Sequence, residues 1–199
     1  MATSARGTRR REQILTQAVA QFDEYGYHAT SLQSIADAVG IRKASLYYYF
    51  ANKDEILLEL HDRLIDEVTA KHAQRLDAGG LTSTQLIGAM MRDVITLMET
   101  RPGHLRVFFE SYRGLSVDTH DRVSGARSAY RRAIRDVIEA GVASGEFDVD
   151  DPHLASLAVL SLMNWTYQWF DTDGDLSATQ VADGYLQLLL EGMRPHTAG

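Results

Sequence analysis

Apolar side chains recur at helical spacing along most of the chain. In the segment 30–39 they occupy positions i, i+3, i+4 and i+7, which gives one apolar helix face: Leu32, Ile35, Ala36 and Val39. No segment alternates apolar and polar residues with the period of two that a half-buried strand requires, and we find no internal repeat. The pattern predicts an all-α chain of about nine helices.

Capping residues and helix breakers set the expected boundaries. Thr30 with Gln33, and Thr82 with Gln85, have the spacing of a capping box, and Ser177 with Gln180 has the same spacing at the start of the last expected helix. Asp151 is expected to cap the helix that Pro152 begins. Gly40 suits a left-handed turn, because glycine has no Cβ to clash there. Pro102 suits the first turn of a helix. The expected helices are about 8–25, 30–39, 43–50, 53–76, 82–100, 102–112, a long helix that follows a polar stretch at 114–121 and ends near 145, then 152–170 and 177–193.

Charge separates the two ends of the chain. Residues 1–53 hold seven basic and four acidic side chains, which gives a net charge of +3. Because the whole chain has a net charge of −7, residues 54–199 have a net charge of −10. The basic residues include an arm at 6–11, which we expect to be disordered in isolation. A basic end joined to an acidic body is the asymmetry expected when one end meets phosphate.

The segment 43–50 has two chemically different sides on a helical wheel. Leu46 and Phe50 fall together and should face a core with the two preceding helices. The opposite side presents small, hydroxyl and aromatic residues, and two cations stand at its start: Arg42, Lys43, Ala44, Ser45, Tyr47 and Tyr48. Such a side can enter a DNA groove. The alternative is that the three consecutive tyrosines are ordinary packing residues.

The chemistry of that outward side suits DNA. A tyrosine hydroxyl donates to phosphate or its ring contacts a thymine methyl, and lysine donates to the acceptors of guanine. Ala44 is small enough for the backbone to approach closely. Lys53, at the start of the next helix, is placed for a further phosphate. A short helix pinned by a glycine turn and presented this way is typical of a helix-turn-helix.

These residues resemble the N-terminal domain of TetR-type transcriptional regulators. The resemblance lies in Thr30-Ser31-Leu32, Ile35-Ala36, Gly40-Ile41, the run from Lys43 to Phe50, and Asn52-Lys53-Asp54, and it covers about residues 10–60. It implies a DNA-binding domain at 1–52, a ligand-binding and dimerisation domain at 53–199, and a homodimer on a palindromic double-stranded DNA operator. It also implies DNA contacts from Thr30, Ser31, Lys43, Ser45, Tyr47, Tyr48 and Lys53, and it favours repression.

The body offers a pairing surface and a pocket. The helices 154–163 and 181–190 are apolar on more than one face, so each needs a partner beyond its own core. A four-helix bundle of two protomers meets that need, and a fully internal helix is the alternative. Adaptable methionines and large aromatics are suited to an apolar cavity or to ordinary core. The candidate ligand-binding residues are Met91, Val94, Met98, Phe108, Phe109, Tyr112, Trp165 and Trp169.

A second, shorter resemblance concerns the effector. The run from Asn164 to Phe170, then Asp173-Gly174-Asp175-Leu176-Ser177 and Val181-Ala182, is similar to TetR-type regulators that answer acyl-CoA thioesters. It implies an acyl-CoA effector whose phosphates meet arginines of the body. Salt bridges on solvated helix faces are the alternative role for these arginines: Arg106, Arg113, Arg127, Arg131 and Arg132.

Other classes of function find little support. The chain has no cysteine, which excludes disulfides and thiolate metal sites, and it has no His-Glu-x-x-His, Gly-x-Ser-x-Gly or phosphate-binding glycine loop. Asp118, His120 and Asp121 suit a polar loop better than a metal site. We expect no cofactor, no signal peptide, no membrane span and a cytoplasmic location. The predicted function is a ligand-responsive DNA-binding regulator; the alternatives are a binding module without DNA regulation and, less favoured, an enzyme.

Overall fold

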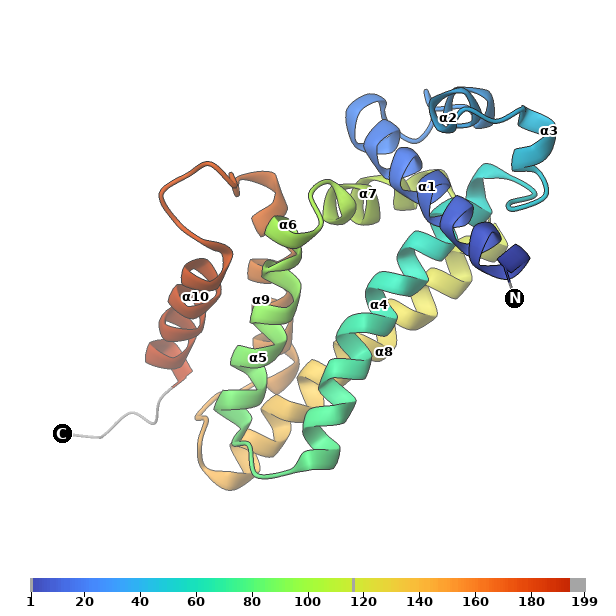
Figure 1. Cartoon of the computed structure of the whole chain (residues 1–199). Helices are drawn as coiled ribbons and strands as arrows, with labels where there is room; N and C mark the ends of the chain where they lie inside the picture. Colours follow the sequence, from blue (N-terminus) through green and yellow to red (C-terminus); the bar gives the residue numbers. More distant parts are fainter. Residues whose placement is uncertain (1, 116, 194–199) are drawn as a thin grey trace. The chain divides into compact units, whose positions relative to one another are not determined.

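The computed structural model describes residues 2–115 and 117–193. Within these residues it has ten α-helices and two short 3₁₀ helices and no strand, which confirms the all-α prediction (Figure 1). Helices α5 (Ser83–Ile95) and α6 (Leu97–Thr100) are separated only by Thr96. Counted as one helix, they account for the nine helices expected from the sequence.

The chain packs as two compact units. Unit 1 comprises Met1–Leu64 and Gly103–Ser124, and unit 2 comprises Ile65–Pro102 and Gly125–Gly199. Two long helices, α4 (Lys53–Ala78) and α8 (Val117–Ser144), contribute to both units. The expected functional boundary between residues 52 and 53 therefore does not coincide with a packing boundary, and it stays a prediction.

Unit 1 contains α1 (Ala2–Tyr25), α2 (Leu32–Val39) and α3 (Lys43–Leu46), with α7 (His104–Glu110) and the 3₁₀ helix η1 (Ser111–Gly114). One apolar core joins these helices to the first turns of α4. Its most deeply buried members are Ile14, Ala18, Ile35, Ala36, Leu46, Phe50, Ile56 and Leu57. Since this core includes residues of α4 and Val107 of α7, the three N-terminal helices are not packed alone.

The start of α2 differs from the prediction by one residue. Ser31, not Thr30, is the N-cap, and it forms a capping box with Ser34 instead of the expected pair of Thr30 and Gln33. The reason is that the Thr30 hydroxyl turns inward, where it donates to the carbonyl oxygens of Gln21 and Gly26, both at 3.0 Å. The Gln33 side chain instead donates to Asp37 at 2.7 Å.

Gly40 ends α2 in the predicted left-handed conformation, with φ 71° and ψ 38°. Its N–H donates to Asp37 O, and the next N–H, of Ile41, donates to Ala36 O. This closes the helix and turns the chain toward α3. A residue with a Cβ would be strained at this position, so the turn depends on glycine.

Three expected boundaries were wrong. The basic arm is helical, because α1 extends from Ala2 through Arg11 and has no break before Tyr25. The stretch 117–121, expected as part of a polar loop with Asp118, His120 and Asp121, opens α8. Pro102 precedes α7 instead of starting it, because Gly103 takes a left-handed N-cap conformation with φ 77° and the helix begins at His104.

Unit 2 is built around α5, which packs against α9 (Pro152–Trp165) and α10 (Ala178–Met193). The capping box of Thr82 and Gln85 starts α5 as predicted, and Asp151 with Pro152 starts α9 as predicted. Glu146 further stabilises the start of α5, because its carboxylate accepts hydrogen bonds from the N–H groups of Ser83 and Thr84, both at 3.0 Å. Desolvation alone would raise the pKa of Glu146, but these backbone hydrogen bonds outweigh it and lower the pKa.

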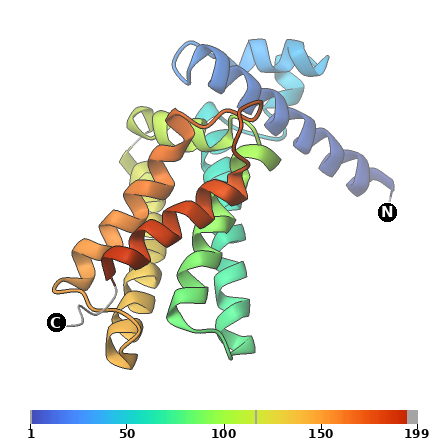
Figure 2. The same ribbon diagram turned by 90° about the vertical axis from the view of Figure 1, so that its left-hand side faces the viewer.

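Helices α9 and α10 lie side by side (Figure 2). In the single chain both helices expose apolar residues. Leu154 is 64% exposed, Trp165 65% and Leu188 62%. The opposite sides of the same helices are buried, at residues such as Val159, Met163 and Val181. The two-sided apolar character read from the sequence thus corresponds to one face in the core and one face that this chain leaves uncovered.

No helix among the described residues is long and apolar enough to cross a bilayer.

We predict that Leu46→Ala destabilises unit 1 by about 2–5 kcal/mol, because truncating a fully buried leucine removes apolar contacts and leaves a cavity. Leu76, which is 53% exposed, is the matched control, and Leu76→Ala should change the free energy of unfolding by less than about 0.5 kcal/mol. Urea unfolding followed by circular dichroism measures both. Equal losses in the two variants would contradict the assigned burial.

Candidate nucleic-acid interface

The segment 42–50, which we call the recognition segment, is shorter in regular helix than expected. Only Lys43–Leu46 is α-helical, and Tyr47–Tyr49 continue as a tight turn in which Tyr49 N–H donates to Leu46 O at 2.8 Å. Phe50 N–H donates to the same carbonyl at 3.1 Å. The turn keeps the helical hand, so the two sides read from the helical wheel are preserved.

The inward side of the recognition segment is anchored in the core of unit 1. Leu46 and Phe50 are 0% and 1% exposed, as predicted. The outward side is open: Tyr48 is 85% exposed and Tyr47 48% exposed. Tyr49 is half-buried and meets the Tyr48 ring edge-on at a centroid distance of 5.2 Å. Simple core packing is therefore excluded for Tyr47 and Tyr48.

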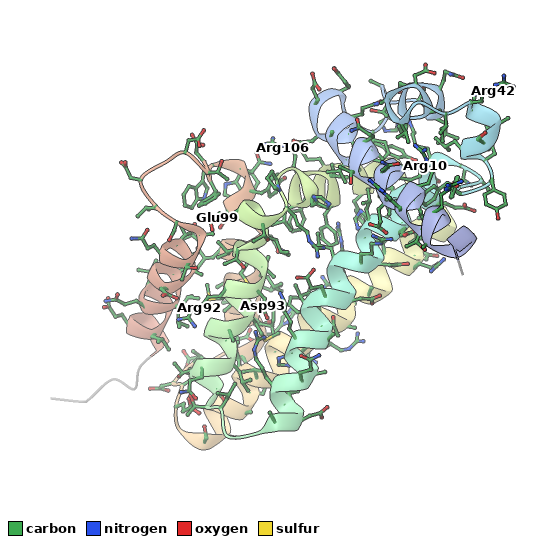
Figure 3. All side chains as sticks on the ribbon, in the orientation of Figure 1. Arg10, Arg42, Arg92, Asp93, Glu99 and Arg106 are labelled. Atoms are coloured by element: carbon green, nitrogen blue, oxygen red, sulfur yellow. The ribbon has the colours of Figure 1, made fainter. Side chains whose placement is uncertain are left out.

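Cations stand at the start of the exposed side. Arg42 and Lys43 are exposed, as are Ala44 and Ser45 (Figure 3 labels Arg42). Within the described parts of the chain, neither the Arg42 nor the Lys43 side chain forms a hydrogen bond or an ion pair, and Lys43 Nζ lies 5.9 Å from the centre of the Tyr47 ring. Ser31, at the N-cap of α2, is also exposed. These groups are available to an external ligand.

Other cations of unit 1 serve the structure. Arg11 on α1 donates through Nη1 to Tyr49 O at 2.7 Å and stacks on the Phe50 ring, with the guanidinium carbon 4.1 Å from the ring centre. It also forms an ion pair with Glu59 of α4. Arg10 donates to Val39 O at 3.1 Å, at the last turn of α2. The supposed arm thus fixes the recognition segment.

The ion pair of Arg11 belongs to a larger network between α1 and α4. Arg63 donates to both carboxylate oxygens of Glu12 at 2.7 Å and to Glu59 at 2.6 Å. The hydrogen bond from Arg63 lowers the pKa of Glu12, so this carboxylate stays charged further into the acidic range than an ordinary glutamate. A bidentate pair of this geometry adds directional specificity to the packing of the two helices.

Lys53 and Thr30, both expected at DNA, form an internal clamp. Lys53 Nζ donates to Thr30 O at 2.7 Å and to Tyr27 O, and it lies 4.2 Å from the centre of the Tyr27 ring. Burial lowers the pKa of Lys53, and the Tyr27 hydroxyl bonds to Asp54. Thr30 is only 3% exposed, and its hydroxyl donates to the Gln21 carbonyl oxygen inside unit 1. Thr30 therefore does not belong to the exposed surface of the recognition segment.

Sequence reasoning did not identify Arg11 as a structural residue or Lys53 as a clamp. Both roles depend on contacts across 38 and 23 positions of the chain. A local pattern carries no signal for such pairs, and both residues read simply as cations near a basic end.

The predicted ligand-binding residues fall into both units. Met91, Val94 and Met98 are buried in unit 2, along α5 and α6. In unit 1, Phe108 is buried and stacks on His61 at a centroid distance of 4.4 Å, Phe109 meets Phe108 edge-on, and the Tyr112 hydroxyl bonds to Ser124. Ligand binding by these residues stays a prediction.

The two tryptophans differ from the expectation of a shared cavity lining. Trp165 is 65% exposed and Trp169 47% exposed, so within one chain neither is enclosed. Trp165 ends α9, and the short 3₁₀ helix η2 (Thr166–Gln168) separates it from Trp169, whose ring contacts Tyr185 and Phe170. Because the α-helix ends at Trp165, the two tryptophans do not lie on consecutive turns of one continuous α-helix.

Two of the five arginines considered for an acyl-CoA form contacts on helix surfaces. Arg106 of α7 pairs with Asp23 at 3.1 Å and with Glu110 at 3.7 Å (Figure 3). Arg131 donates to Ser128 at 2.7 Å. Arg132 is exposed, Arg127 is half-buried, and the Arg113 side chain lies outside the described residues. For Arg106, the surface salt bridge is the role that the structure supports.

Together, these contacts place a short cationic and aromatic surface on a rigid base. Its inward residues are fixed by the apolar core and by Arg11, and its outward residues offer cations, hydroxyls and an exposed ring. Cations and hydroxyls bind phosphate, and side chains of a protruding helix reach base edges in the major groove. The geometry suits double-stranded DNA.

Two family models match the chain over adjacent regions. Residues 14–60 match the model of bacterial regulatory proteins of the tetR family, and residues 80–193 match the tetracyclin repressor-like C-terminal domain. The first match contains the whole recognition segment with its clamp, and the second contains the exposed face of α9 and α10.

Individual relatives agree with the family models. The HTH-type transcriptional repressor KstR2 of Mycolicibacterium smegmatis is 28% identical over 96% of this chain and 94% of its own. The structure of the TetR family transcriptional regulator PfmR from Thermus thermophilus is 31% identical, with a TM-score of 0.83 over 92% of this chain and 99% of its own.

The solved structure of a third relative contains a CoA thioester and operator DNA. The structure of AibR in complex with isovaleryl coenzyme A and operator DNA is 25% identical, with a TM-score of 0.79 over 91% of this chain and 98% of its own. The family models, the full-length relatives and the exposed recognition segment agree, and the chain belongs to the TetR family of ligand-responsive, DNA-binding transcriptional regulators.

Proposed function

We propose that this protein is a homodimeric repressor that binds a palindromic operator and is released from it by an acyl-CoA. The observation that carries the proposal is the recognition segment, where Leu46 and Phe50 are buried while Tyr47 and Tyr48 are exposed. The proposed DNA contacts come from the exposed side chains of that segment and of the α2 N-cap: Ser31, Arg42, Lys43, Ala44, Ser45, Tyr47 and Tyr48.

Each contact has a chemical role. Lys43 and Arg42 donate to phosphate or to guanine acceptors, and the Tyr47 and Tyr48 hydroxyls donate to phosphate while their rings contact thymine methyl groups. Ala44 allows close approach of the backbone. Thr30 and Lys53 act indirectly in this proposal, because their polar atoms hold the loop before α2 against the start of α4.

The exposed apolar face of α9 and α10 supports dimerisation. Leu154, Leu157 and Trp165 lie on one side of α9, and Leu188 lies on α10. A second copy related by a two-fold axis would cover the same residues on both chains, as an isologous interface requires. Such a dimer presents two recognition segments, which suits half-sites spaced about 34–36 Å apart along DNA.

The effector class rests on the relatives. AibR was solved with isovaleryl coenzyme A and operator DNA, and KstR2 is a transcriptional repressor. Within unit 2 the proposed ligand lining is Met91, Val94 and Met98, and Trp165 and Trp169 are assigned to the dimer face instead. Ligand binding by Phe108, Phe109 and Tyr112 of unit 1 is a separate proposal. Ligand releases DNA in this scheme only because it binds the DNA-incompetent state more tightly.

The relatives are transcriptional regulators, and we propose no catalytic role and no cofactor for this chain. The proposed place of action is the cytoplasm, where a bacterial operator is accessible. A binding module without DNA regulation is the competing function. The intact, outward-facing Arg42 and Lys43 favour the regulator over this module.

We predict different consequences for two lysines of unit 1. Lys43→Ala should reduce the salt dependence of operator affinity by about two units of slope and leave the free energy of unfolding unchanged, because it removes one phosphate contact from each protomer of the dimer. Lys53→Ala should destabilise unit 1 by about 1–3 kcal/mol, because it leaves the carbonyl groups of Tyr27 and Thr30 without their charged donor. Fluorescence anisotropy titrations at several salt concentrations, on the intergenic DNA upstream of the protein's own gene, measure the operator affinity of each variant. Thermal unfolding measures the stability of each variant. Identical behaviour of the two variants would contradict the division between contact and clamp.

Tyr48→Ala should weaken operator binding about tenfold or more with little change in melting temperature, since the side chain is 85% exposed and loses, besides its DNA contacts, only an edge contact with the Tyr49 ring. Tyr25, 60% exposed at the end of α1, is the matched control, and Tyr25→Ala should bind DNA as the natural protein does. Fluorescence anisotropy on the same DNA measures both affinities. A loss of affinity in Tyr25→Ala equal to that in Tyr48→Ala would argue against the assigned surface.

Addition of the correct acyl-CoA should raise the dissociation constant for operator DNA, because allosteric coupling of about 1–3 kcal/mol corresponds to a 5–150-fold change. The measurement is the same anisotropy titration with a panel of acyl-CoAs of different chain length, and free CoA as the control. Tight DNA binding that no thioester changes would keep the regulator and reject the effector class. No DNA binding at low salt would favour the binding module.

A further inference from the structure

Unit 2 contains a buried polar cluster that the proposed ligand lining does not include. It is formed by His72 and Arg75 of α4, Asp93 of α5 and Tyr130 of α8. Asp93 and its neighbour Arg92 leave α5 on different sides (Figure 3), and Arg92 pairs with Asp183 of α10 at 2.6 Å. Asp93 is 8% exposed and binds Arg75 with two hydrogen bonds, one of them 2.9 Å long from Nη2 to Oδ1.

Two polar atoms of this cluster have no hydrogen-bond partner among the residues that the structure describes. They are the Tyr130 hydroxyl and His72 Nδ1. Both side chains are more than nine-tenths buried, with exposures of 7% for Tyr130 and 6% for His72. A buried hydroxyl or imidazole nitrogen is normally paired, so an unpaired one calls for a water molecule or a ligand.

The electrostatics of the cluster favour an uncharged partner. Burial raises the pKa of Tyr130, with Asp93 contributing in the same direction. Burial and the neighbouring Arg75 lower the pKa of His72, against the opposing effects of Asp93 and Asp136. At neutral pH both groups are therefore neutral, and the charges of Arg75 and Asp93 already satisfy one another. A neutral hydroxyl that can donate is suited to a carbonyl or hydroxyl oxygen.

The cluster has apolar neighbours and adjoins a surface groove. Met90 and Leu97 lie about one helical turn on either side of Asp93, and they are 0% and 2% exposed. A surface groove of about 310 Å³ is lined by Arg75 together with Lys71, Gln74, Ala78, Gly79 and Leu81. Arg75 thus lines the groove and also bonds to buried Asp93, which connects the cluster to the surface.

We infer that Tyr130 and His72, beside the Arg75–Asp93 ion pair, form a binding subsite in unit 2 for the carbonyl or hydroxyl oxygen of a small organic ligand. Tyr130 donates its O–H to that oxygen, and the His72 imidazole offers a second polar contact. The apolar part of the ligand lies among side chains such as Met90. This inference rests on the proposed function where the ligand is the effector. The carbonyl oxygen of an acyl thioester then accepts the hydrogen bond from Tyr130.

The test compares two ligands that differ only in that carbonyl, on two matched variants. Isothermal titration calorimetry measures binding of isovaleryl-CoA and palmitoyl-CoA, and of the thioether analogues in which the carbonyl is replaced by CH₂. Tyr130→Phe removes only the hydroxyl oxygen, and Tyr25→Phe makes the same change at a residue that is 60% exposed in unit 1. Thermal unfolding of each ligand-free variant accompanies the titrations.

We expect at least one thioester to bind the natural protein, and Tyr130→Phe to bind it about tenfold more weakly. The thioether should bind both proteins equally, and Tyr25→Phe should behave as the natural protein. Ligand-free Tyr130→Phe should unfold at the same temperature as the natural protein or at a higher one. The substitution removes a buried hydroxyl that has no hydrogen-bond partner, and with it the cost of desolvating that group.

Equal thioester affinity of the natural protein and Tyr130→Phe would overturn the subsite, and so would a lack of binding by both thioesters. If Tyr130→Phe lowers the melting temperature, the Tyr130 hydroxyl stabilises the ligand-free protein by a hydrogen bond to a buried water molecule, which would overturn the subsite. These results are separable from those on DNA. Loss of the subsite with intact operator binding leaves the repressor in place, whereas thioester binding that depends on Tyr130 in a protein that binds no operator would retain the subsite and reject the repressor.

Discussion

Burial of Leu46 and Phe50 is the constraint on which the proposed DNA surface depends. Helix α3 has four residues, far fewer than the roughly twelve that an isolated helix needs in water. Its conformation is therefore stabilised by tertiary contacts. Because these two side chains are fully enclosed by α1, α2 and the first turns of α4, residues 42–45 before them and Tyr47 and Tyr48 between them are left facing outward. The same contacts that stabilise the segment also orient it.

The cations of unit 1 divide into two groups with different surroundings. Arg10, Arg11 and Lys53 donate to backbone carbonyls of α2, of the recognition segment and of the loop before α2. Arg42 and Lys43 point into solvent. The first group satisfies carbonyls at chain turns, which would otherwise lack partners. The second group remains free for phosphate. The net positive charge at the chain's beginning thus includes cations that stabilise the fold and exposed cations that the proposed function assigns to DNA.

Unit 2 combines an exposed apolar face with an enclosed polar cluster. The face on α9 and α10 needs a partner surface because large apolar patches are unfavourable in water. The cluster of His72, Arg75, Asp93 and Tyr130 shows the reverse situation, polar atoms enclosed without full hydrogen bonding. Both features are costly in an isolated chain. A regulator that pairs with a second copy and binds a ligand resolves both.

Much of the fold was readable from the sequence. Helical periodicity, the capping boxes of Thr82 and Ser177, the Asp151–Pro152 start and the left-handed Gly40 depend on residues close in the chain, and the structure confirms each. The inward and outward sides of the recognition segment followed from the helical wheel for the same reason. Local hydrogen bonds and side-chain periodicity act over a few residues, so a linear pattern records them.

Contacts between distant residues were decided only by the tertiary structure. The shift of the α2 N-cap from Thr30 to Ser31 arose because Thr30 found acceptors on α1, and Lys53 became a clamp because Tyr27 and Thr30 came within its reach. The exposure of Trp165 and the enclosure of Tyr130 depend on which helix covers each one. The sequence by itself determined the all-α class, the inward and outward sides of the recognition segment and the family. Packing decided which polar groups are used inside the protein and which remain for a ligand, because that choice is set by three-dimensional proximity.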